Sequence, residues 1–281
     1  MSTAERIRLA CAFLAIAASI TAADIAGAQE SAAASGREVV EAIETDRDSF
    51  TPATTVVGPR AFVLESAYSF IDNRRTLDTH SFPETLIRYG IGEVFELRFG
   101  GNYEVGGAGN TISGSVGAIE DEDVVRLERE SQISYGFKTL LTEQRGFVPR
   151  TAFIAQGLTP TSGPDPATQL TLTYAYGWQL PNRWQWDSSL RYATDAAEGD
   201  HYGLWAPSSV LKIPLTERWN AHVEYFGIYS DGRRSESTLH YFSPGSHFLL
   251  TPNCEVGARV GWGLNEQAAA FFANFGVGLR F

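Results

Sequence analysis

Charged residues at alternate positions within apolar stretches are the features of this chain that could do chemistry. In residues 95–99, Glu96 and Arg98 alternate with Phe95, Leu97 and Phe99. A β-strand with this pattern presents charges on one face and apolar side chains on the other. Along the chain the pattern predicts a polar, lumen-lining face with six acidic and six basic residues: Glu65, Glu84, Glu96, Asp187, Glu224, Glu255, Arg88, Arg98, Lys138, Arg191, Arg259 and Arg280.

The balance of these charges favours ion pairs between neighbouring strands, because opposite charges that face each other stabilise a strand pair. In a hairpin over residues 81–103, a register centred on residue 92 places Arg88 opposite Glu96. A register moved by two residues places Glu84 opposite Arg98. Either register gives a charged interior that could line a narrow pore or fill a closed one.

Nucleophilic catalysis is a second chemistry that the residue types allow. A serine nucleophile needs a base within hydrogen-bond reach, and His80-Ser81 and His240 lie near expected outer loops. The chain contains no G-x-S-x-G motif of the kind that carries a hydrolase serine. The sequence therefore predicts a protein that is not an enzyme, and a lipid hydrolase is the alternative.

The sequence predicts neither a metal site nor a cofactor. The acidic run 120–123 lacks the spaced Asp/Asn ligands and the glycine of a calcium loop. In Asp46-Arg47-Asp48 the central arginine favours local pairing over metal binding. Only Cys254 remains after residue 28, which excludes an internal disulfide and a cysteine-rich metal site.

The first 28 residues have the layout of a secretory signal peptide. Arg6 and Arg8 form a positive start, residues 9–20 are apolar, and Ala26-Gly27-Ala28 is a cleavage site before Gln29. The apolar stretch is shorter than the roughly 20 residues that a spanning helix needs. The net charge of -11 argues against nucleic acid as a partner, because phosphate binding relies on Lys and Arg.

The segments that carry the charges resemble membrane-crossing strands. They run about 9–11 residues, the length that a tilted strand needs to cross a bilayer. Aromatic residues bracket their apolar stripes, as Trp219 and Tyr229 do, and short turns alternate with longer polar loops. We predict an all-β fold, a transmembrane antiparallel up-and-down β-barrel of about 12 strands: 61–70, 81–89, 94–103, 131–140, 148–157, 169–179, 184–193, 204–213, 219–229, 239–249, 254–264 and 271–281.

The predicted domains are a signal peptide (1–28), a periplasmic N-terminal segment (29–60) and an outer-membrane barrel (61–281). Whether residues 29–60 enter the lumen stays open. Pro149, Pro207 and Pro244 lie in or beside three of the strands, and proline weakens a strand assignment. A barrel of ten strands is therefore the alternative.

The C-terminus resembles the β-signal that the barrel-assembly machinery reads in outer-membrane proteins. Asn274, Gly276, Leu279 and the terminal Phe281 fill its pattern of a polar residue, a glycine, a hydrophobic residue and a final aromatic residue. The expected partners are therefore the assembly machinery and outer-membrane lipid.

Most of residues 44–281 also resemble a known family, and the first part of this range carries the family's motifs. The resemblance is carried by residues 44–51 (Glu-Thr-Asp-Arg-Asp-Ser-Phe-Thr), by Gly58, by residues 62–68, and by residues 83–90 followed by 95–98. The family core reads Asp-Arg-Pro-Asp-Phe-Thr; here no proline separates Arg47 from Asp48, and Ser49 follows. The chain is similar to transporters of the phenol-degradation meta-pathway, which implies a barrel and an outer-membrane transport role without fixing a substrate.

The sequence thus predicts an outer-membrane channel or transporter for small solutes, aromatic or hydrophobic compounds among them. A structural barrel without transport is the main alternative. About eight strands enclose an interior that side chains just fill, and about sixteen leave a wide channel. Twelve strands lie between these limits, so an open and a plugged lumen are both compatible with the sequence.

Overall fold

The computed structural model describes residues 42–107, 110, 112–113, 127–163, 167–197, 200–233 and 235–281. The predicted signal peptide and the acidic run 120–123 lie outside these ranges. Within them, no helix is long and apolar enough to cross a membrane.

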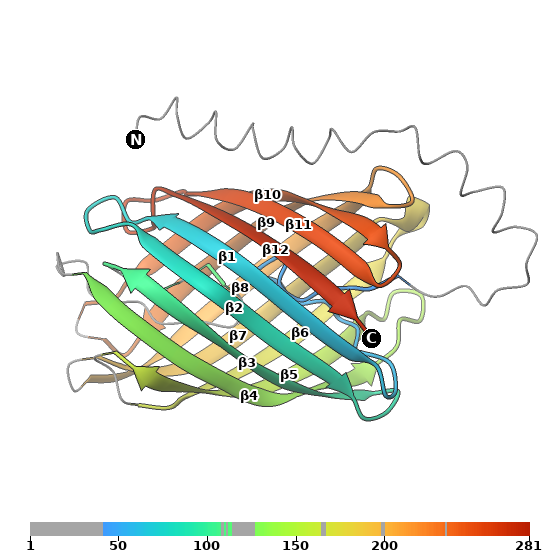
Figure 1. Cartoon of the computed structure of the whole chain (residues 1–281), viewed down its shortest axis with the longest axis horizontal. Coiled ribbons are helices and arrows are strands. Elements are labelled where there is room, and N and C mark those ends of the chain that lie inside the picture. The colour runs from blue at the N-terminus through green and yellow to red at the C-terminus, as the bar shows by residue number, and fades with distance from the viewer. Residues whose placement is uncertain are drawn as a thin grey trace, which may run out of the picture. The chain divides into compact units, whose positions relative to one another are not determined.

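Twelve antiparallel strands close into a barrel (Figure 1). One short 3-10 helix, η1 (Pro181–Arg183), lies in the turn between β6 and β7. The strands are β1 (Phe62–Asp72), β2 (Thr79–Gly90), β3 (Phe95–Gly106), β4 (Glu128–Thr142), β5 (Arg150–Ser162), β6 (Gln169–Gln179), β7 (Gln185–Ala197), β8 (Asp200–Pro214), β9 (Trp219–Asp231), β10 (Thr238–Thr251), β11 (Cys254–Gly263) and β12 (Phe271–Arg280).

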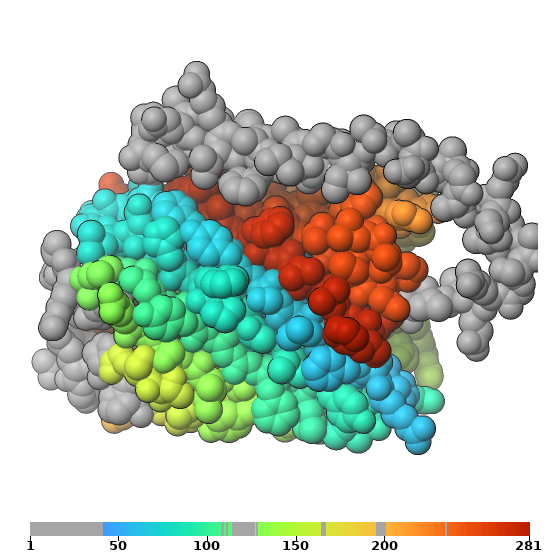
Figure 2. Space-filling model, viewed as in Figure 1, coloured from blue at the N-terminus to red at the C-terminus, as the bar shows by residue number. Residues whose placement is uncertain are grey.

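The barrel closes between its first and last strands. β1 pairs with β12 from Val63 opposite Arg280 to Asp72 opposite Phe271, and Figure 2 shows the two strands packed side by side (cyan and red). Closure satisfies the backbone groups that an edge strand would expose, which is the condition for a sheet to cross lipid. Since β1 begins and β12 ends at one end of the barrel, that end is the periplasmic end by the usual asymmetry of turns and loops.

The predicted fold class is confirmed, and twelve strands replace the alternative of ten. Pro207 and Pro244 lie inside β8 and β10, opposite Leu190 and Val223, and pairing continues on both sides of each proline. β7 and β8 extend into the region 194–203 that the sequence assigned to a loop, because Asp195 still pairs with Tyr202.

The alternation of the strands sorts side chains between the two faces of the wall. Phe99 and Val223 are exposed on the outside, whereas the neighbouring Arg98 and Glu224 are buried inside. Exposed aromatic residues lie near both ends of the outer face, as an aromatic girdle requires: Trp184, Trp186 and Trp219 near the periplasmic end, and Tyr68, Tyr103, Trp205 and Trp262 near the other.

The register of the β2–β3 hairpin differs from both predicted alternatives. Arg88 lies opposite Arg98, and Gly90 lies opposite Glu96, which centres the hairpin on residue 93. A break in the register between Ser81 and Thr85 separates the two ends of β2. Two arginines therefore face each other inside the barrel, where the sequence predicted opposite charges.

The lipid-facing assignment predicts a large difference between two arginine substitutions. Val223→Arg places a charge on the outer face near the middle of β9 and should destabilise the barrel by roughly 2–4 kcal/mol. Glu217→Arg, in an exposed turn outside the strands, is the matched control and should change stability little. Urea unfolding of the refolded protein in lipid measures both, and equal stabilities would contradict the assigned faces.

Candidate functional site: an N-terminal plug in the lumen

Residues 43–57 lie inside the barrel, and we call this segment the plug; Ala42 and residues 58–60 are exposed at the periplasmic rim. It enters near the periplasmic turn between β10 and β11, where the Ile43 N–H donates to the Pro252 carbonyl at 2.9 Å. It leaves near the β2–β3 turn, where the Arg60 N–H donates to the Gly90 carbonyl at 2.8 Å. Between these points, Phe50 stacks on Phe226 of β9 with ring centroids 4.3 Å apart. The structure thus answers the question that the sequence left open for these residues.

Three buried cations on β2, β3 and β4 form the main attachment point of the plug. Arg88 faces Arg98, and Lys138 faces Glu96 in the next strand pair. Asp46 of the plug reaches all three cations. Its Oδ2 lies 2.5 Å from Arg98 Nη1, 3.1 Å from Lys138 Nζ and 3.9 Å from Arg88 Nε.

The wall supplies two further carboxylates to this cluster. Glu96 accepts bonds from Arg88 at 3.0 Å and from Arg98 at 2.7 Å. Glu65 pairs with Arg88 at 3.1 Å and accepts the backbone N–H groups of Asp46 and Arg47 at 2.9 and 3.0 Å. With Asp46 included, three carboxylates balance three cations.

The surroundings of Asp46 keep its carboxyl group ionised. Burial by itself raises the pKa of Asp46, but the guanidinium of Arg88, the ammonium of Lys138 and the guanidinium of Arg98 outweigh it. Together they hold the pKa well below its ordinary value. The attachment therefore persists throughout the neutral pH range.

The residues that follow Asp46 also bind the wall. The Arg47 guanidinium pairs with Glu84 of β2. Asp48 Oδ2 lies 3.2 Å from His247 Nδ1 and 3.7 Å from Lys212 Nζ. Local pairing within the triplet was the expectation from sequence; the structure gives each of the three residues a partner on the wall.

Glu224 of β9 holds the tip of the plug. Its carboxylate accepts the N–H groups of Phe50 at 2.9 Å and Thr51 at 2.7 Å, and pairs with Arg259 of β11 at 3.1 Å. Arg191 of β7 lies over the Phe50 ring, 4.3 Å from its centroid, and donates to the Phe50 carbonyl at 3.3 Å. The tip is therefore fixed by hydrogen bonds and by aromatic contacts.

Beyond the tip, the lumen is apolar on the side of β7 to β10 and β12, which the sequence did not predict, whereas Asn102 and Glu104 keep the β3 side polar. Aromatic doublets were the missed signal: Tyr225-Phe226, Tyr241-Phe242 and Phe271-Phe272 put an aromatic residue on both faces of a strand. The inward members contact the plug tip and described parts of the outer loops in one buried cluster: Phe50, Ile71, Ile112, Ala193, Tyr202, Leu204, Ala206, Phe226, Ile228, Leu239, Tyr241, Ala268, Ala269 and Phe272.

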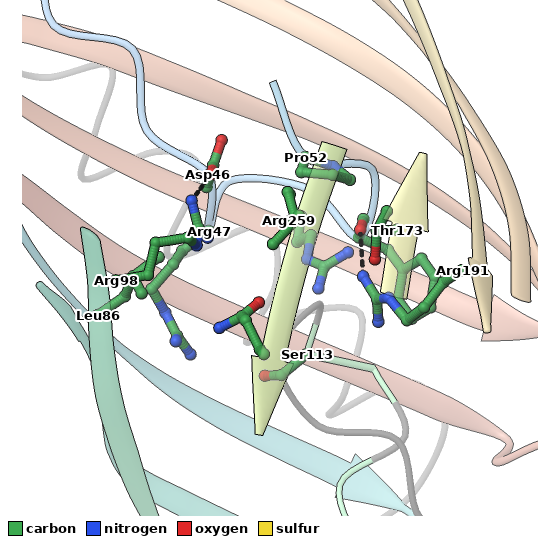
Figure 3. Close-up of a pocket in the computed structure, with 12 residues that line it drawn as sticks. Asp46, Arg47, Pro52, Leu86, Arg98, Ser113, Thr173, Arg191 and Arg259 are labelled. Carbon is green, nitrogen blue, oxygen red and sulfur yellow. Dashed lines mark hydrogen bonds and ion pairs between the residues drawn. The ribbon is translucent and has the colours of Figure 1, made fainter. Parts of the chain in front are cut away.

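A cavity of about 20 Å³ lies beside the plug, enough for about one water molecule. Its lining includes Asp46 and the guanidinium groups of Arg47, Arg98, Arg191 and Arg259, several of which Figure 3 shows around the plug. A second cavity of similar size lies between the plug and strands β1, β11 and β12. Neither cavity is large enough for a solute larger than water.

Eleven of the twelve predicted lumen-lining residues are buried. The other, Arg280, lies at the periplasmic rim and binds Asn253 at 2.7 Å. Asp187 and Glu255 contact plug threonines, Thr54 at 3.5 Å and Thr45 at 2.8 Å. Lys212, which pairs with plug carboxylates, was missing from the predicted set. The roles of these residues in transport stay predictions.

The residues predicted to form the assembly signal lie on the closing strand and at its end. Asn274 points inward and donates to Ser69 at 2.7 Å, Gly276 pairs with Ala67, and Leu279 pairs with Leu64 of β1. Phe281 is exposed beyond the strand end. Recognition by the assembly machinery stays a prediction.

The serine and histidine residues considered for catalysis lie on different faces. His80 is exposed on the outer face, where its Nδ1 bonds the Tyr68 hydroxyl at 2.7 Å, whereas Ser81 is buried inside. His240 bonds the Tyr225 hydroxyl in the same way at 2.7 Å. Neither histidine is placed as a base for Ser81.

The closed barrel, its aromatic girdles and its charged interior define an outer-membrane β-barrel protein. A family model described as "Putative MetA-pathway of phenol degradation" matches residues 45–281, and the chain belongs to this family. No curated protein matches the chain in sequence.

Solved structures with the same fold include a channel, a porin and the translocator domain of an autotransporter. An outer membrane channel from Pseudomonas putida F1 is 12% identical, with a TM-score of 0.53 over 85% of this chain and 100% of that chain. The NanC porin is 8% identical, with a TM-score of 0.50 over 77% and 98%. The translocator domain of autotransporter NalP from Neisseria meningitidis is 13% identical, with a TM-score of 0.51 over 80% and 90%. These likenesses show that the chain has the fold of an outer-membrane β-barrel.

The cation cluster predicts a large effect of Asp46→Asn. The substitution leaves Arg88, Arg98 and Lys138 with too few carboxylates and should cost about 3–5 kcal/mol, as the loss of one partner of a buried ion pair does. Asp78→Asn, in the exposed β1–β2 loop, is the control. Urea unfolding measures both, and equal stabilities would contradict the assigned attachment.

The pH dependence of this difference follows from the lowered pKa of Asp46. A carboxyl group whose pKa is lower in the folded than in the unfolded protein stabilises the fold fully above its unfolded-state pKa, about 3.9 for Asp. That stabilisation is lost as the pH falls through the folded-state pKa. The gap between wild type and Asp46→Asn should therefore stay constant from pH 8 to about pH 5 and close only in stronger acid.

Proposed function

We propose that this protein is an outer-membrane channel for small solutes, closed in the described state by its own plug. The supporting observation is that a tethered segment fills the periplasmic part of the lumen, in contact with inward side chains of the wall. About eight strands suffice for side chains to fill a barrel, so twelve strands enclose additional space, part of which the plug occupies. When that segment moves, a passage opens.

The contacts of the plug suit a gate. Asp46, Arg47 and Asp48 attach to the wall through ion pairs. A buried ion pair contributes little net stability compared with well-packed apolar groups, because desolvation offsets the attraction. Water that enters the lumen hydrates both partners as they separate. The plug can therefore leave at moderate cost without unfolding the barrel.

The lumen also supports a solute class, which we propose to be small aromatic carboxylates. Inward aromatic side chains such as Tyr241 and Phe272 suit stacking with a ring. Arg191 lies against Phe50, and Arg259 lies 5.4 Å from the centroid of the Phe272 ring. A guanidinium next to an aromatic surface is the arrangement that pairs with a carboxylate on a ring.

We further infer that the protein is not an enzyme. Two of the solved structures with this fold, described above, are a channel and a porin. His80 and Ser81 point to opposite faces of β2, so the proposed nucleophile and base do not meet.

Deleting residues 43–57 should open the channel. In planar bilayers the wild type should show rare, brief openings, and the deletion variant a steady conductance with weak ion selectivity, because acidic and basic groups both line the wall. Adding Arg98→Glu and Arg191→Glu should shift the preference toward cations, since charge in a narrow pore sets selectivity.

Heat modifiability on gels shows whether the deletion variant has folded. If it cannot fold, Asp46→Asn offers a second route, because a loosened plug should open more often. Folded variants that never conduct would favour the structural barrel and contradict the proposed function.

The proposed solute class predicts selective uptake into liposomes that carry the deletion variant. Benzoate should enter faster than acetate, which lacks the ring, and faster than benzyl alcohol, which lacks the charge. Arg191→Gln should slow benzoate and leave benzyl alcohol unchanged. Equal rates for the three solutes would remove the proposed class while leaving the channel itself intact.

A further inference from the structure

Asp48 and two histidines form a cluster of metal-ligating groups between the plug and the wall. His222 of β9 and His247 of β10 point inward, and Asp48 approaches them from the plug. One ligand atom from each residue lies within 4.8 Å of the others. The imidazole rings stack with centroids 5.5 Å apart.

The hydrogen bonding of the cluster is incomplete. His222 is 2% exposed, and neither ring nitrogen has a hydrogen-bond partner among the described residues. The same holds for Asp48 Oδ1 and for His247 Nδ1, although the latter lies 3.2 Å from Asp48 Oδ2. Buried polar atoms are nearly always satisfied in folded proteins. Several unsatisfied lone pairs at one point therefore indicate a missing electrophilic partner.

The wall is built to admit the His222 ring. Gly245 of β10 lies opposite His222. A Cβ atom at position 245 would lie 2.3 Å from His222 Nε2 and 2.4 Å from its Cε1, so any other residue would push the ring away. A glycine thus keeps this imidazole inside the lumen, next to the plug.

We propose that Asp48, His222 and His247 bind a divalent transition-metal ion of the Zn²⁺ type, which ties the plug to β9 and β10. Two imidazoles and a carboxylate are a usual zinc donor set, with metal–ligand distances of about 2.0–2.2 Å. Ligand atoms of a tetrahedral site with these bonds lie about 3.3 Å apart. The Asp48–His247 pair, at 3.2 Å, already has that spacing, and the His222 ligand atom lies within 4.8 Å of both. A water molecule or a solute carboxylate completes the coordination.

Nearby cations do not prevent binding. Lys212 pairs with Asp48 at 3.7 Å, but it also pairs with Glu44 of the plug at 3.5 Å, so it keeps a carboxylate partner when a metal takes Asp48. Arg259 already pairs with Glu224. Imidazole ligands favour zinc-like ions over Ca²⁺ and Mg²⁺, which prefer oxygen.

Metal titration of the refolded full-length protein, stripped with EDTA, tests the site. Zn²⁺ should bind with one equivalent in calorimetry, and Co²⁺ should give the visible absorption of a tetrahedral complex. His222→Gln, His247→Gln and Asp48→Asn should each weaken binding at least about tenfold, since even groups that only support metal ligands change affinity 10–100-fold. Gly245→Ala should weaken it without removing a ligand.

His201→Ala is the matched control, because His201 is exposed at the start of β8, at the end of the barrel opposite the entry of the plug. It should leave the one-equivalent binding unchanged. Binding that survives the His222 and His247 substitutions in folded protein, or that disappears with His201, would overturn the proposed site.

The tie between plug and wall rests on the proposed gating and has its own readout. Zn²⁺ should lower the open probability of wild-type channels and should not affect His222→Gln channels. Zinc binding without any change in opening would retain the metal site and reject its role in holding the plug.

Discussion

The closed lumen depends on one carboxylate placed among three buried cations. The register of the β2–β3 hairpin sets Arg88 opposite Arg98, with Lys138 beside them. Like charges directly opposite one another destabilise a strand pair, and the wall does not contain enough nearby carboxylates to offset all three. Asp46, which lies in the plug and not in a strand of the wall, provides the remaining negative charge. The barrel wall is therefore electrostatically complete only when the plug is in place.

This dependence explains why the interior has two zones. Near the periplasmic half, the polar backbone and charges of the plug require charged partners on the wall, and ion pairs form on several sides at once. Beyond the tip at Phe50 the plug no longer supplies polar groups. On the side of β9, β10 and β12, inward positions there hold Phe226, Tyr241 and Phe272, which pack against parts of the outer loops, whereas Asn102 and Glu104 keep the β3 side polar.

The fold could be predicted because the bilayer imposes a local rule on sequence. Every second residue of a membrane-crossing strand must be compatible with lipid. Alternation over the length of a strand therefore identifies the strand, its lipid-facing side and its approximate bounds without knowledge of the partner strand. The inward face is subject to no such rule. Glu65 and Glu224 are recognisable as inward residues, yet nothing local reveals that they accept backbone groups of a segment far away in the chain.

Two other features were beyond the sequence for related reasons. The hairpin register depends on the conformation of the turn after Gly90, which shifts which charges face each other without altering the alternation. The plug has no periodic pattern, since its residues contact many strands in succession. The apolar part of the lumen could have been predicted from the Phe271-Phe272 doublet, because two adjacent aromatic residues in a strand place one of them on the inner face.

The direct connection between the plug and β1 has a consequence for how such a closure behaves. Gly58 to Ala61 are all that separate the end of the plug from the first strand, so the segment acts as a tethered ligand. A short flexible tether gives an effective concentration in the millimolar range. The balance between bound and released segment is then independent of how much protein the membrane contains. A free peptide of the same sequence would compete only at concentrations of that order. Each plug therefore closes only the barrel to which it is tethered.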